Sequence, residues 1–379
     1  MTQFPAAQMM GLVDSAVRYD LAESTTPALR LGDLAQPGEL AGLRLEYGNS
    51  AGDAELRSLI AARAGVQADE VLMTVGASQA LFLLAQDRCG PGDHAVVASP
   101  CFPPTRSVPE GLGARVSLLP LRFESGYRLP LDELAGLLTP QTRLVAVASP
   151  QNPSGVRFTE AELRGLLAAV EEQAPQAVVL VDEIYRESTH GDQPVPASAA
   201  ALSPRVVTCA SLSKAHGAQG LRLGWLTSTD PELYQRLRNA KFLTTIACSI
   251  PDEFAATVVL RHCDEILAPR AARLGQALAE LEDWLAGQPV DWVRPDGGTV
   301  CCLRLRDGDF SDAAVRAFHD GLAGHGVRVS PGSWFGAGDR VFRLGFGTLP
   351  AGEFTAALDR LGLALKSARD GTARDGQAS

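Results

Sequence analysis

Short apolar runs alternate with helical patterns between residues 71 and 227 of this 379-residue chain, and this alternation limits its fold more than any other feature. The runs cover residues 71–74, 94–98, 115–119, 143–148, 177–181, 206–210 and 223–227, and a helical pattern at 77–88 separates the first two. Strands that alternate with helices form a mainly parallel sheet with helices on both faces. We therefore predict an α/β fold whose large domain is built on such a sheet.

The pattern changes after about residue 250, where a helical stretch at 265–286 leads into a mixed region. Strand patterns at 299–305, 327–330 and 341–344 and helical patterns at 312–324 and 350–366 predict a second, smaller α+β domain. The predicted organisation is an N-terminal arm at 1–45 that belongs to the small domain, a large domain at 46–285, a small domain at 286–366 and a disordered tail at 367–379.

Composition excludes several classes of partner. The net charge of −10 disfavours nucleic acid and anionic membranes, since both attract basic surfaces. No run approaches the roughly 18 apolar residues of a membrane span, and no basic region followed by an apolar one opens the chain, so we predict a cytoplasmic protein. The seven cysteines lack CxxC or other metal-ligand spacing, which predicts buried thiols in a reducing compartment, with no metal site and no disulfide framework.

The loop after the first run is suited to binding an anion. Gly76, Ala77 and Ser78 stand between the strand at 71–74 and the helix that follows. Free backbone N–H groups and the helix dipole favour a phosphate at such a position, and ligands of this kind of sheet lie at the carboxyl ends of its strands. A plain glycine turn with a serine cap is the alternative.

Two later strands also end in polar side chains. Asn152 stands between two prolines in the loop after 143–148, which would hold its side chain in one orientation, although a simple turn also explains the prolines. Asp182 follows the apolar run at 177–181, and a carboxylate buried there needs a positive partner. A protonated pyridine nitrogen would be such a partner; an arginine or a helix end is the alternative.

One lysine has the surroundings of a nucleophile. Lys214 follows the run at 206–210, stands between small hydroxyl residues and a glycine-rich turn, and precedes Arg222 by eight positions. Burial or a neighbouring cation lowers the pKa of a lysine and makes its amine able to form a Schiff base. Taken alone, the motif also fits an ordinary loop lysine.

These motifs together resemble the class I/II aminotransferases, which are enzymes of fold type I that depend on pyridoxal 5′-phosphate (PLP). The resemblance rests on Asn-Pro-Ser-Gly at 152–155, Asp-Glu-Ile-Tyr at 182–185, Ser-Leu-Ser-Lys at 211–214 with Arg222, and Phe-Arg-Leu at 342–344. The order, spacing and domain placement of the four motifs agree with that family from about residue 32 to about residue 363. The resemblance implies a large domain with a mainly parallel, seven-stranded sheet, a smaller α+β domain, and PLP as the cofactor.

The resemblance also implies a role for each motif residue. Lys214 would form a Schiff base with PLP and carry the proton between the substrate Cα and C4′ of the cofactor. Asp182 would pair with the pyridine nitrogen, while Asn152 and Tyr185 would hydrogen-bond the 3′ oxygen of the ring. The residues that would hold the phosphate are Gly76, Ala77, Ser78, Ser211 and Arg222.

Four further residues are implied at the edges of the site. Phe102 would stack on the pyridine ring, where the family commonly has a tyrosine or tryptophan, so a hydrogen bond from that side chain is missing. Tyr47 would reach the phosphate of the neighbouring subunit, which requires a homodimer. Arg343 would bind the substrate α-carboxylate as a bidentate pair, and Gly32 would add a backbone contact.

The implied activity is that of an aminotransferase, which moves an amino group from an L-amino acid to a 2-oxo acid. A second interpretation keeps the cofactor but gives the outcome of a lyase, an oxidase or a cyclase, because residues 20–24 resemble a subset of enzymes that act on arginine. Glu23 would then contact a cationic side chain, unless it is a surface or helix-capping residue. We disfavour two others: an amino-acid-sensing regulator would need room for a DNA-binding segment before Gly32, and a nicotinamide-binding enzyme would need a GxGxxG motif after a first strand.

Overall fold

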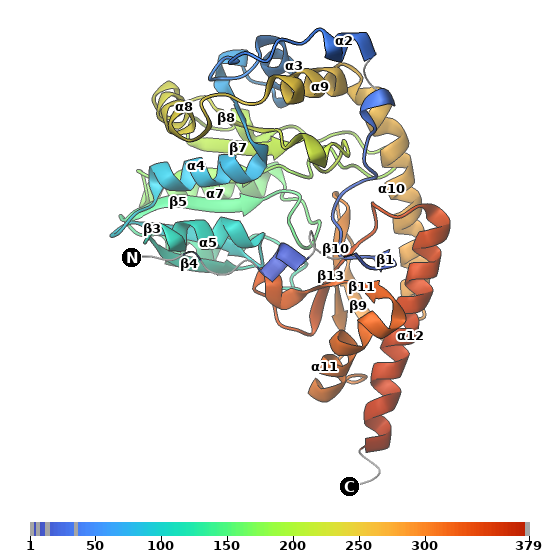
Figure 1. The fold of residues 1–379 in the computed structure, drawn as a ribbon. Helices are drawn as coiled ribbons and strands as arrows, with labels where there is room; N and C mark the ends of the chain where they lie inside the picture. The colour runs from blue at the N-terminus through green and yellow to red at the C-terminus, as the bar shows by residue number, and fades with distance from the viewer. Residues whose placement is uncertain (1–3, 5–7, 12–15, 34–36, 376–379) are drawn as a thin grey trace.

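The larger part of the molecule is organised around one seven-stranded sheet (Figure 1). The computed structural model describes residues 4, 8–11, 16–33 and 37–375. The order of the strands across the sheet is β2-β8-β7-β6-β5-β3-β4, and β8 runs opposite to the other six strands. The bounds are β2 Val71–Thr74, β3 His94–Ser99, β4 Arg115–Pro120, β5 Thr142–Ala148, β6 Val178–Asp182, β7 Val206–Ser211 and β8 Gly224–Ser228. The prediction of a mainly parallel sheet is confirmed.

Alternate side chains of the strands point to opposite faces of this sheet, and both faces are covered by helices. Val145 and Val147 of β5 pack in a core with α6 and α7, whereas Leu144 and Ala146 pack in another core with α4 and α8. Because neither face meets water, the strands are continuously apolar in the sequence. The large-domain helices are α3 Ala54–Ala64, α4 Gly76–Arg88, α5 Pro103–Gly111, α6 Leu131–Leu137, α7 Glu160–Gln173, α8 Pro231–Thr245 and α9 Ile250–Arg261.

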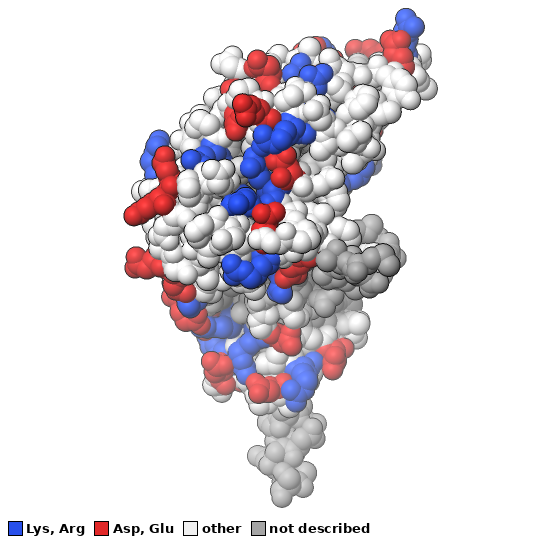
Figure 2. Space-filling model, turned by 90° about the vertical axis from the view of Figure 1, so that its left-hand side faces the viewer, with Lys and Arg blue, Asp and Glu red and all other residues white. Residues whose placement is uncertain are grey.

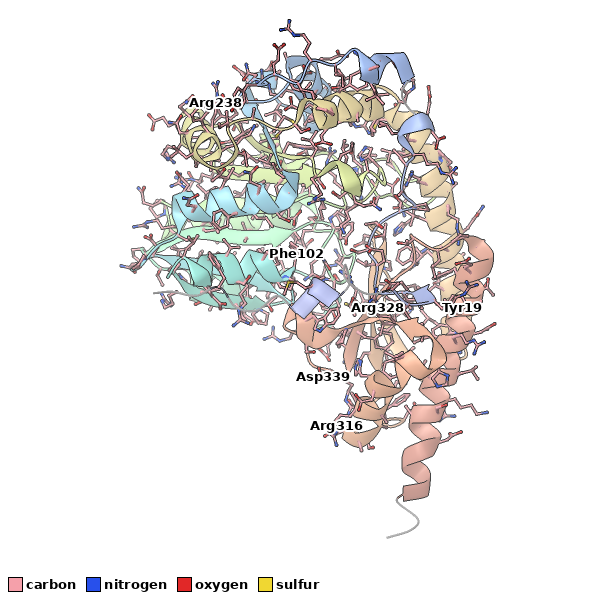
Figure 3. The ribbon with its side chains drawn as sticks, in the orientation of Figure 1. Tyr19, Phe102, Arg238, Arg316, Arg328 and Asp339 are labelled. Carbon is pink, nitrogen blue, oxygen red and sulfur yellow. The ribbon has the colours of Figure 1, made fainter. Side chains whose placement is uncertain are left out.

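The smaller domain is a four-stranded antiparallel sheet of order β12-β13-β10-β9, packed against long helices. Its elements are α10 Cys263–Leu285, β9 Val290–Val293, β10 Val300–Leu305, α11 Asp312–Gly321, β11 Val327–Arg328, β12 Ser330–Pro331, β13 Val341–Gly345 and α12 Ala351–Asp375. Strand β1 (Tyr19–Asp20) pairs in parallel with β11, and Figure 3 shows the labelled Tyr19 and Arg328 on these two strands. The N-terminal arm is thus joined to the small domain at this point.

The arm then crosses to the large domain. After β1 it passes through the short 3-10 helix η2 (Leu31–Asp33) and reaches α2 (Pro37–Ala41), which lies beside α9 at the top of Figure 1. Helix α10 also serves both parts, because Leu267 packs in a large-domain core while Leu274 and Leu285 pack in the small-domain core. The division at 285/286 stays a prediction. The other 3-10 helices are η1 Gln8–Met10, η3 Ala68–Glu70, η4 Ala199–Ala201, η5 Gln219–Leu221, η6 Leu322–His325 and η7 Gly332–Phe335.

The disordered tail predicted at 367–379 is wrong for residues 367–375, because these residues continue α12. Leu361, Leu365 and Ala368 lie in the small-domain core at the spacing of one helix face, so packing carries the helix beyond residue 366. Residues 376–379 lie outside the described part of the chain.

Charged side chains are interspersed on the face of the molecule that lies on the left of Figure 1, as Figure 2 shows. Arg236 of α8 and Asp87 of α4 form an ion pair with Nε 3.0 Å from Oδ1. Among the described residues, no helix is both long enough and apolar enough to cross a membrane. All seven cysteines are buried and free.

Candidate active site

The beginning of α4 forms one end of the candidate site. Val75, which precedes the helix, has no side-chain acceptor, so no N-cap side chain bonds to the first N–H groups of α4. Gly76 has a φ of +70°, and a Cβ at this residue would lie 2.7 Å from Nη2 of Arg222. The glycine is therefore required by its backbone conformation and by the close approach of the guanidinium. A positive group and free N–H donors together suit a phosphate.

Loops after β7 complete this end. Arg222 Nη1 donates to the Gln219 carbonyl oxygen at 2.9 Å and lies 3.5 Å from Ser213 Oγ, and Ser211 Oγ accepts from the Ser213 N–H at 3.1 Å. Ser211 is buried, whereas Ser78 and Arg222 are exposed. The backbone of β8 presses against this helix start, since a Cβ at Gly224 would lie 2.6 Å from the Ala77 nitrogen. The structure thus brings together the residues predicted to hold the phosphate.

Asp182 ends β6 between β5 and β7, in register with Ala148 and Cys209. Its Oδ1 accepts the Ile184 N–H at 3.0 Å. Burial raises the pKa of the Asp182 carboxyl to about 6, opposed by the Ile184 and Cys209 hydrogen bonds and the charge of Lys214. No arginine of the described chain forms an ion pair with Asp182, so the salt-bridge alternative is not realised. A cationic ring nitrogen would match this carboxylate.

Lys214 lies in the loop after β7, half-buried, with Nζ donating to Ser24 Oγ at 2.8 Å. Burial lowers the pKa of its ammonium to about 8, and the charges of Arg343 and Arg222 act in the same direction, whereas Glu23 and Asp182 oppose them. A lysine with this pKa has a substantial fraction of neutral amine near neutral pH, which is the form that acts as nucleophile and base. The ordinary-loop interpretation of Lys214 does not explain these surroundings.

The loop that carries Lys214 is fixed from two sides. Thr26 Oγ1 of the arm donates to the Lys214 carbonyl oxygen at 2.8 Å. On the other side, His216 Nε2 lies 3.2 Å from Cys263 Sγ of α10 and 3.5 Å from Glu187 Oε2. Two arginines pair with Glu187, so protein cations neutralise its negative charge. The contacts of His216 with Cys263 and Glu187 therefore serve to anchor the loop.

Arg343 of β13 forms the other end of the site and is 1% exposed. Its Nη1 donates to Asn152 Oδ1 at 2.9 Å, and its Nη2 donates to the Ala22 carbonyl oxygen at 2.6 Å and to Ser330 Oγ at 3.2 Å. The guanidinium lies over the Phe335 ring, 4.7 Å from its centroid. Its buried Nε has no hydrogen-bond partner, so a donor remains for an anionic ligand.

Tyr185 lies close to both Arg343 and Asp182, and Phe102 is the predicted aromatic residue of the site. The buried Tyr185 hydroxyl has no hydrogen-bond partner of acceptable geometry, although Ser24 lies near enough to lower its pKa. Burial outweighs this effect and raises the pKa of Tyr185, so its hydroxyl is a neutral donor. Phe102 precedes α5, is half-buried, and lies on the side of the large sheet that faces the small domain (Figure 3).

Two predicted residues lie apart from this cluster in the single chain. Gly32 is exposed in η2, with no atom within 4 Å of where a Cβ would be, and the arm's backbone contact to Arg343 comes from Ala22. Tyr47 is 83% exposed. The roles of Gly32 and Tyr47 stay predictions.

Sequence reasoning missed Ala22, Ser24, Thr26 and Ser330 as parts of the site. The only signal was the neighbourhood of Glu23, since the three arm residues flank it. Glu23 is half-buried and close enough to Lys214, Tyr185 and Arg343 to affect the pKa of each. Its carboxylate therefore belongs to the site and is not a surface residue remote from it.

The residues fit PLP. Gly76 at the start of α4 and the Arg222 guanidinium beside it suit its phosphate, Asp182 suits its ring nitrogen, and Lys214 offers an amine for its aldehyde. The unpartnered Tyr185 hydroxyl and Arg343 Nε are the two buried polar atoms expected to meet the ring oxygen and a substrate carboxylate.

Comparison with known proteins places the chain in a family. The family "Aminotransferase class I and II" matches residues 8–361. A capreomycidine synthase from Streptomyces vinaceus is 33% identical over 342 residues, which cover 88% of this chain and 85% of that protein. An arginine–pyruvate transaminase from Pseudomonas aeruginosa is 32% identical over 299 residues, covering 76% of this chain and 75% of that one. Among solved structures, the PLP-dependent cyclase OrfR has a TM-score of 0.83 at 31% identity and covers 92% of this chain and 93% of its own. The chain therefore belongs to the aminotransferase class I and II family and has its aspartate aminotransferase-like, fold type I architecture.

Proposed function

We propose that this enzyme is an aminotransferase that moves an amino group from an L-amino acid to a 2-oxo acid. The observation that carries the proposal is that one site brings together the Lys214 amine, the Asp182 carboxyl and the Arg343 guanidinium, the last two both close enough to affect the pKa of Lys214. The cofactor of the family is PLP, which when bound accepts the electrons released as a bond to the substrate Cα breaks.

Each end of the site then has a defined task. Arg343, fixed by Asn152 and Ala22, binds the α-carboxylate and so orients the amino acid. Lys214 accepts the Cα proton at Nζ as a neutral amine and returns it from the ammonium form. Asp182 keeps the ring nitrogen protonated, and the Tyr185 hydroxyl donates to the ring oxygen.

The substrate of this proposal is an L-amino acid with a cationic side chain, such as arginine. Glu23 supports it, because this carboxylate lies among Lys214, Tyr185 and Arg343 and no ion pair within the described chain satisfies it. A guanidinium or ammonium group would pair with it. The name of the similar arginine–pyruvate transaminase agrees with this substrate class.

A second candidate function is a PLP reaction with another outcome on the same kind of substrate, such as cyclisation, oxidation or elimination. The likeness to capreomycidine synthase and to the cyclase OrfR favours it. The two candidates share the site residues and differ in where the proton and electrons go after the Cα–H bond breaks, so product analysis separates them.

The test is to add L-arginine, L-methionine, L-aspartate and L-alanine separately to PLP-loaded protein, first without and then with pyruvate. An aminotransferase gives a stoichiometric 2-oxo acid from the donor, bleaches the visible cofactor absorbance, and recovers it when pyruvate is added. Product formation that needs no 2-oxo acid, or that consumes oxygen, contradicts transamination and supports the second candidate. A protein that takes up no PLP contradicts both.

Glu23→Gln tests the substrate class. Since a half-buried carboxylate pairs well with a guanidinium, we expect kcat/KM for L-arginine to fall roughly 10- to 100-fold, with a change of less than about threefold for L-alanine. Equal losses for both amino acids would contradict side-chain recognition by Glu23. Glu39→Gln, a change in the arm at α2 rather than at the site, is the matched control.

The proposal includes a homodimer in the cytoplasm, with two observations in support. Tyr47 (83% exposed) follows Leu45 (84% exposed) by two positions in the sequence. Leu243 (86% exposed) lies at the end of α8, where Thr244 accepts a hydrogen bond from Gln79 of α4. Exposed apolar side chains, of which Leu243 lies close to the first turn of α4, indicate a surface that a second copy would cover. The free, buried cysteines suit a reducing compartment.

A further inference from the structure

The arm makes a contact with Lys214 that no motif of the sequence predicted. Lys214 Nζ donates to Ser24 Oγ at 2.8 Å, across 190 positions of sequence. Ser24 is 6% exposed, so bulk water does not compete freely for its hydroxyl. The contact concerns the atom that carries the proton in the proposed function.

The backbone of Ser24 is held in place by hydrogen bonds on both sides. The Ser24 N–H donates to Glu23 Oε1 at 2.7 Å, and the Ser24 carbonyl oxygen accepts from Thr299 Oγ1 at 2.8 Å. The next carbonyl oxygen, of Thr25, accepts from Thr348 Oγ1 at 2.9 Å. The arm is thus pinned to the small domain at successive residues, and the hydroxyl is presented from a fixed backbone.

The same segment also fixes the backbone of the lysine. Thr26 Oγ1 donates to the Lys214 carbonyl oxygen at 2.8 Å and to that of Ala215 at 3.2 Å. Two side chains of the arm, two positions apart, therefore hold the two ends of one lysine. A long, flexible side chain is confined in this way to a small region of space.

A hydroxyl is suited to a group that changes charge. It accepts a hydrogen bond from an ammonium, and it can accept from or donate to a neutral amine. A carboxylate in the same place would favour the ammonium strongly and hinder its role as a base. An uncharged partner holds the amine while leaving it able to take up and release a proton.

We propose that Ser24 is a positioning residue that holds the Lys214 amine in place for proton transfer at the substrate Cα, with Thr26 fixing the same lysine through its backbone. The role rests on the proposed function. In this proposal Ser24 touches neither substrate nor cofactor and acts on proton transfer through Lys214, while it also lies near the Tyr185 hydroxyl.

The first test measures Lys214 alone, in the full-length protein without added PLP. The rate at which 1-fluoro-2,4-dinitrobenzene arylates Lys214 is followed against pH by peptide mass spectrometry. Since Ser24 Oγ stabilises the ammonium, Ser24→Ala should lower the pKa of Lys214 and move the half-maximum of arylation to lower pH. Thr25→Ala, which removes a neighbouring buried hydroxyl that makes no bond to Lys214, should leave it unchanged. An unchanged half-maximum in Ser24→Ala overturns the proposal.

The second test measures proton transfer in PLP-loaded protein, as exchange of the Cα hydrogen of L-arginine or L-alanine with solvent deuterium. We expect exchange to slow roughly 10- to 100-fold in Ser24→Ala, as for a misplaced catalytic group, and to recover within about threefold of wild type in Ser24→Thr. PLP content and its fixation to Lys214 by borohydride should stay equal in all variants. Equal slowing in Thr25→Ala, or no recovery in Ser24→Thr, would show a general disturbance of the arm and overturn the assignment.

The two tests separate this proposal from the proposed function. The arylation test needs no cofactor, so it decides the Ser24 contact even if the wild-type protein binds no PLP. If wild type binds PLP but exchanges no Cα hydrogen, the proposed function fails while the arylation result still stands.

Discussion

The phosphate end of the site is made by strand and helix ends of one domain, whereas the substrate end joins three segments that are distant in sequence. Gly76 begins α4, Ser211 ends β7, and Arg222 lies between η5 and β8, all within the large domain. Arg343, in contrast, contacts Asn152 across 191 positions and Ala22 across 321 positions. The small domain and the arm are therefore needed for one end of the site and not for the other.

The two ends also differ in burial. Arg222 and Ser78 are exposed, while Arg343 is 1% and Tyr185 is 0% exposed. A substitution at the exposed end removes a contact to a ligand and leaves water to solvate its neighbours. A substitution at the buried end leaves protein groups unpaired as well, so it affects stability and function together.

Lys214 stands between the two ends and should show the largest effect. Lys214→Ala removes the proposed nucleophile and proton carrier, so we expect turnover to fall by roughly 10⁴-fold or more. Because burial disfavours the ammonium in the fold, the free energy of unfolding should not decrease much. Steady-state kinetics, thermal unfolding and borohydride labelling check these expectations. Turnover within tenfold of wild type would remove Lys214 from the mechanism. Lys241→Ala, at the buried lysine of α8, is the control for loss of a lysine side chain.

Asp182→Asn should separate function from stability. The pKa of Asp182 is raised to about 6 from 3.8, so the folded, cofactor-free protein binds this proton more tightly than the unfolded chain. Stability is therefore lost as pH rises from about 4 through about 6, and it stays lost above that range. We expect Asp182→Asn to raise the unfolding free energy of the cofactor-free protein at pH 7.5 by up to about 3 kcal/mol, and by much less at pH 4. Turnover should fall roughly 10³-fold, since the electron-accepting ring loses its counter-charge.

Urea unfolding of the cofactor-free protein at the two pH values, with kinetics of the loaded enzyme, measures both effects. A variant less stable than wild type at pH 7.5 would show that Asp182 is stabilised by partners other than the cofactor.

The difference between the two ends explains what the sequence could predict. The strands were predictable from their local apolar runs, and Asp182, Lys214 and the residues expected to hold the phosphate stand in local motifs at strand ends, which carried the resemblance to a family. Ser24 and Ala22 were not, because a short polar segment has no pattern that says which lysine or arginine it will meet. The fold alone brings Ser24 to Lys214 and Ala22 to Arg343.

The end of the chain shows a related limit. Polar residues such as Arg369 and Asp370 follow the apolar positions of α12, and they indicated disorder when composition alone was considered. The helix continues because Leu365 and Ala368 pack on the small-domain core, and this contact depends on tertiary structure.

Arg343→Lys tests the buried end with the charge retained. A lysine cannot reproduce the planar fork that bonds to Asn152 and Ala22, so both groups lose a partner. We expect kcat/KM to fall roughly 100-fold, mainly through KM, and the protein to become less stable by about 2 kcal/mol. Kinetics with the preferred amino acid and thermal unfolding check this. Arg340→Lys, in the loop before β13, is the control for replacing an arginine by a lysine near the strand. If Arg343→Lys changes kcat alone, this would argue against carboxylate binding by Arg343.

Tyr47→Phe tests the exposed end and should have the smallest effect. If Tyr47 reaches the phosphate of a partner subunit, removing its hydroxyl costs one hydrogen bond to a charged group and should weaken PLP binding roughly 10-fold, with no loss of stability in the cofactor-free chain. Equilibrium dialysis gives the PLP affinity, and analytical ultracentrifugation shows whether the protein is a dimer. Tyr234→Phe, which removes a hydroxyl bonded to the Val71 carbonyl oxygen, is the matched control. If the wild-type protein is a monomer and Tyr47→Phe binds PLP as tightly as wild type, no partner subunit contributes to the phosphate end. The large domain alone would then complete that end, whereas the substrate end needs the small domain and the arm.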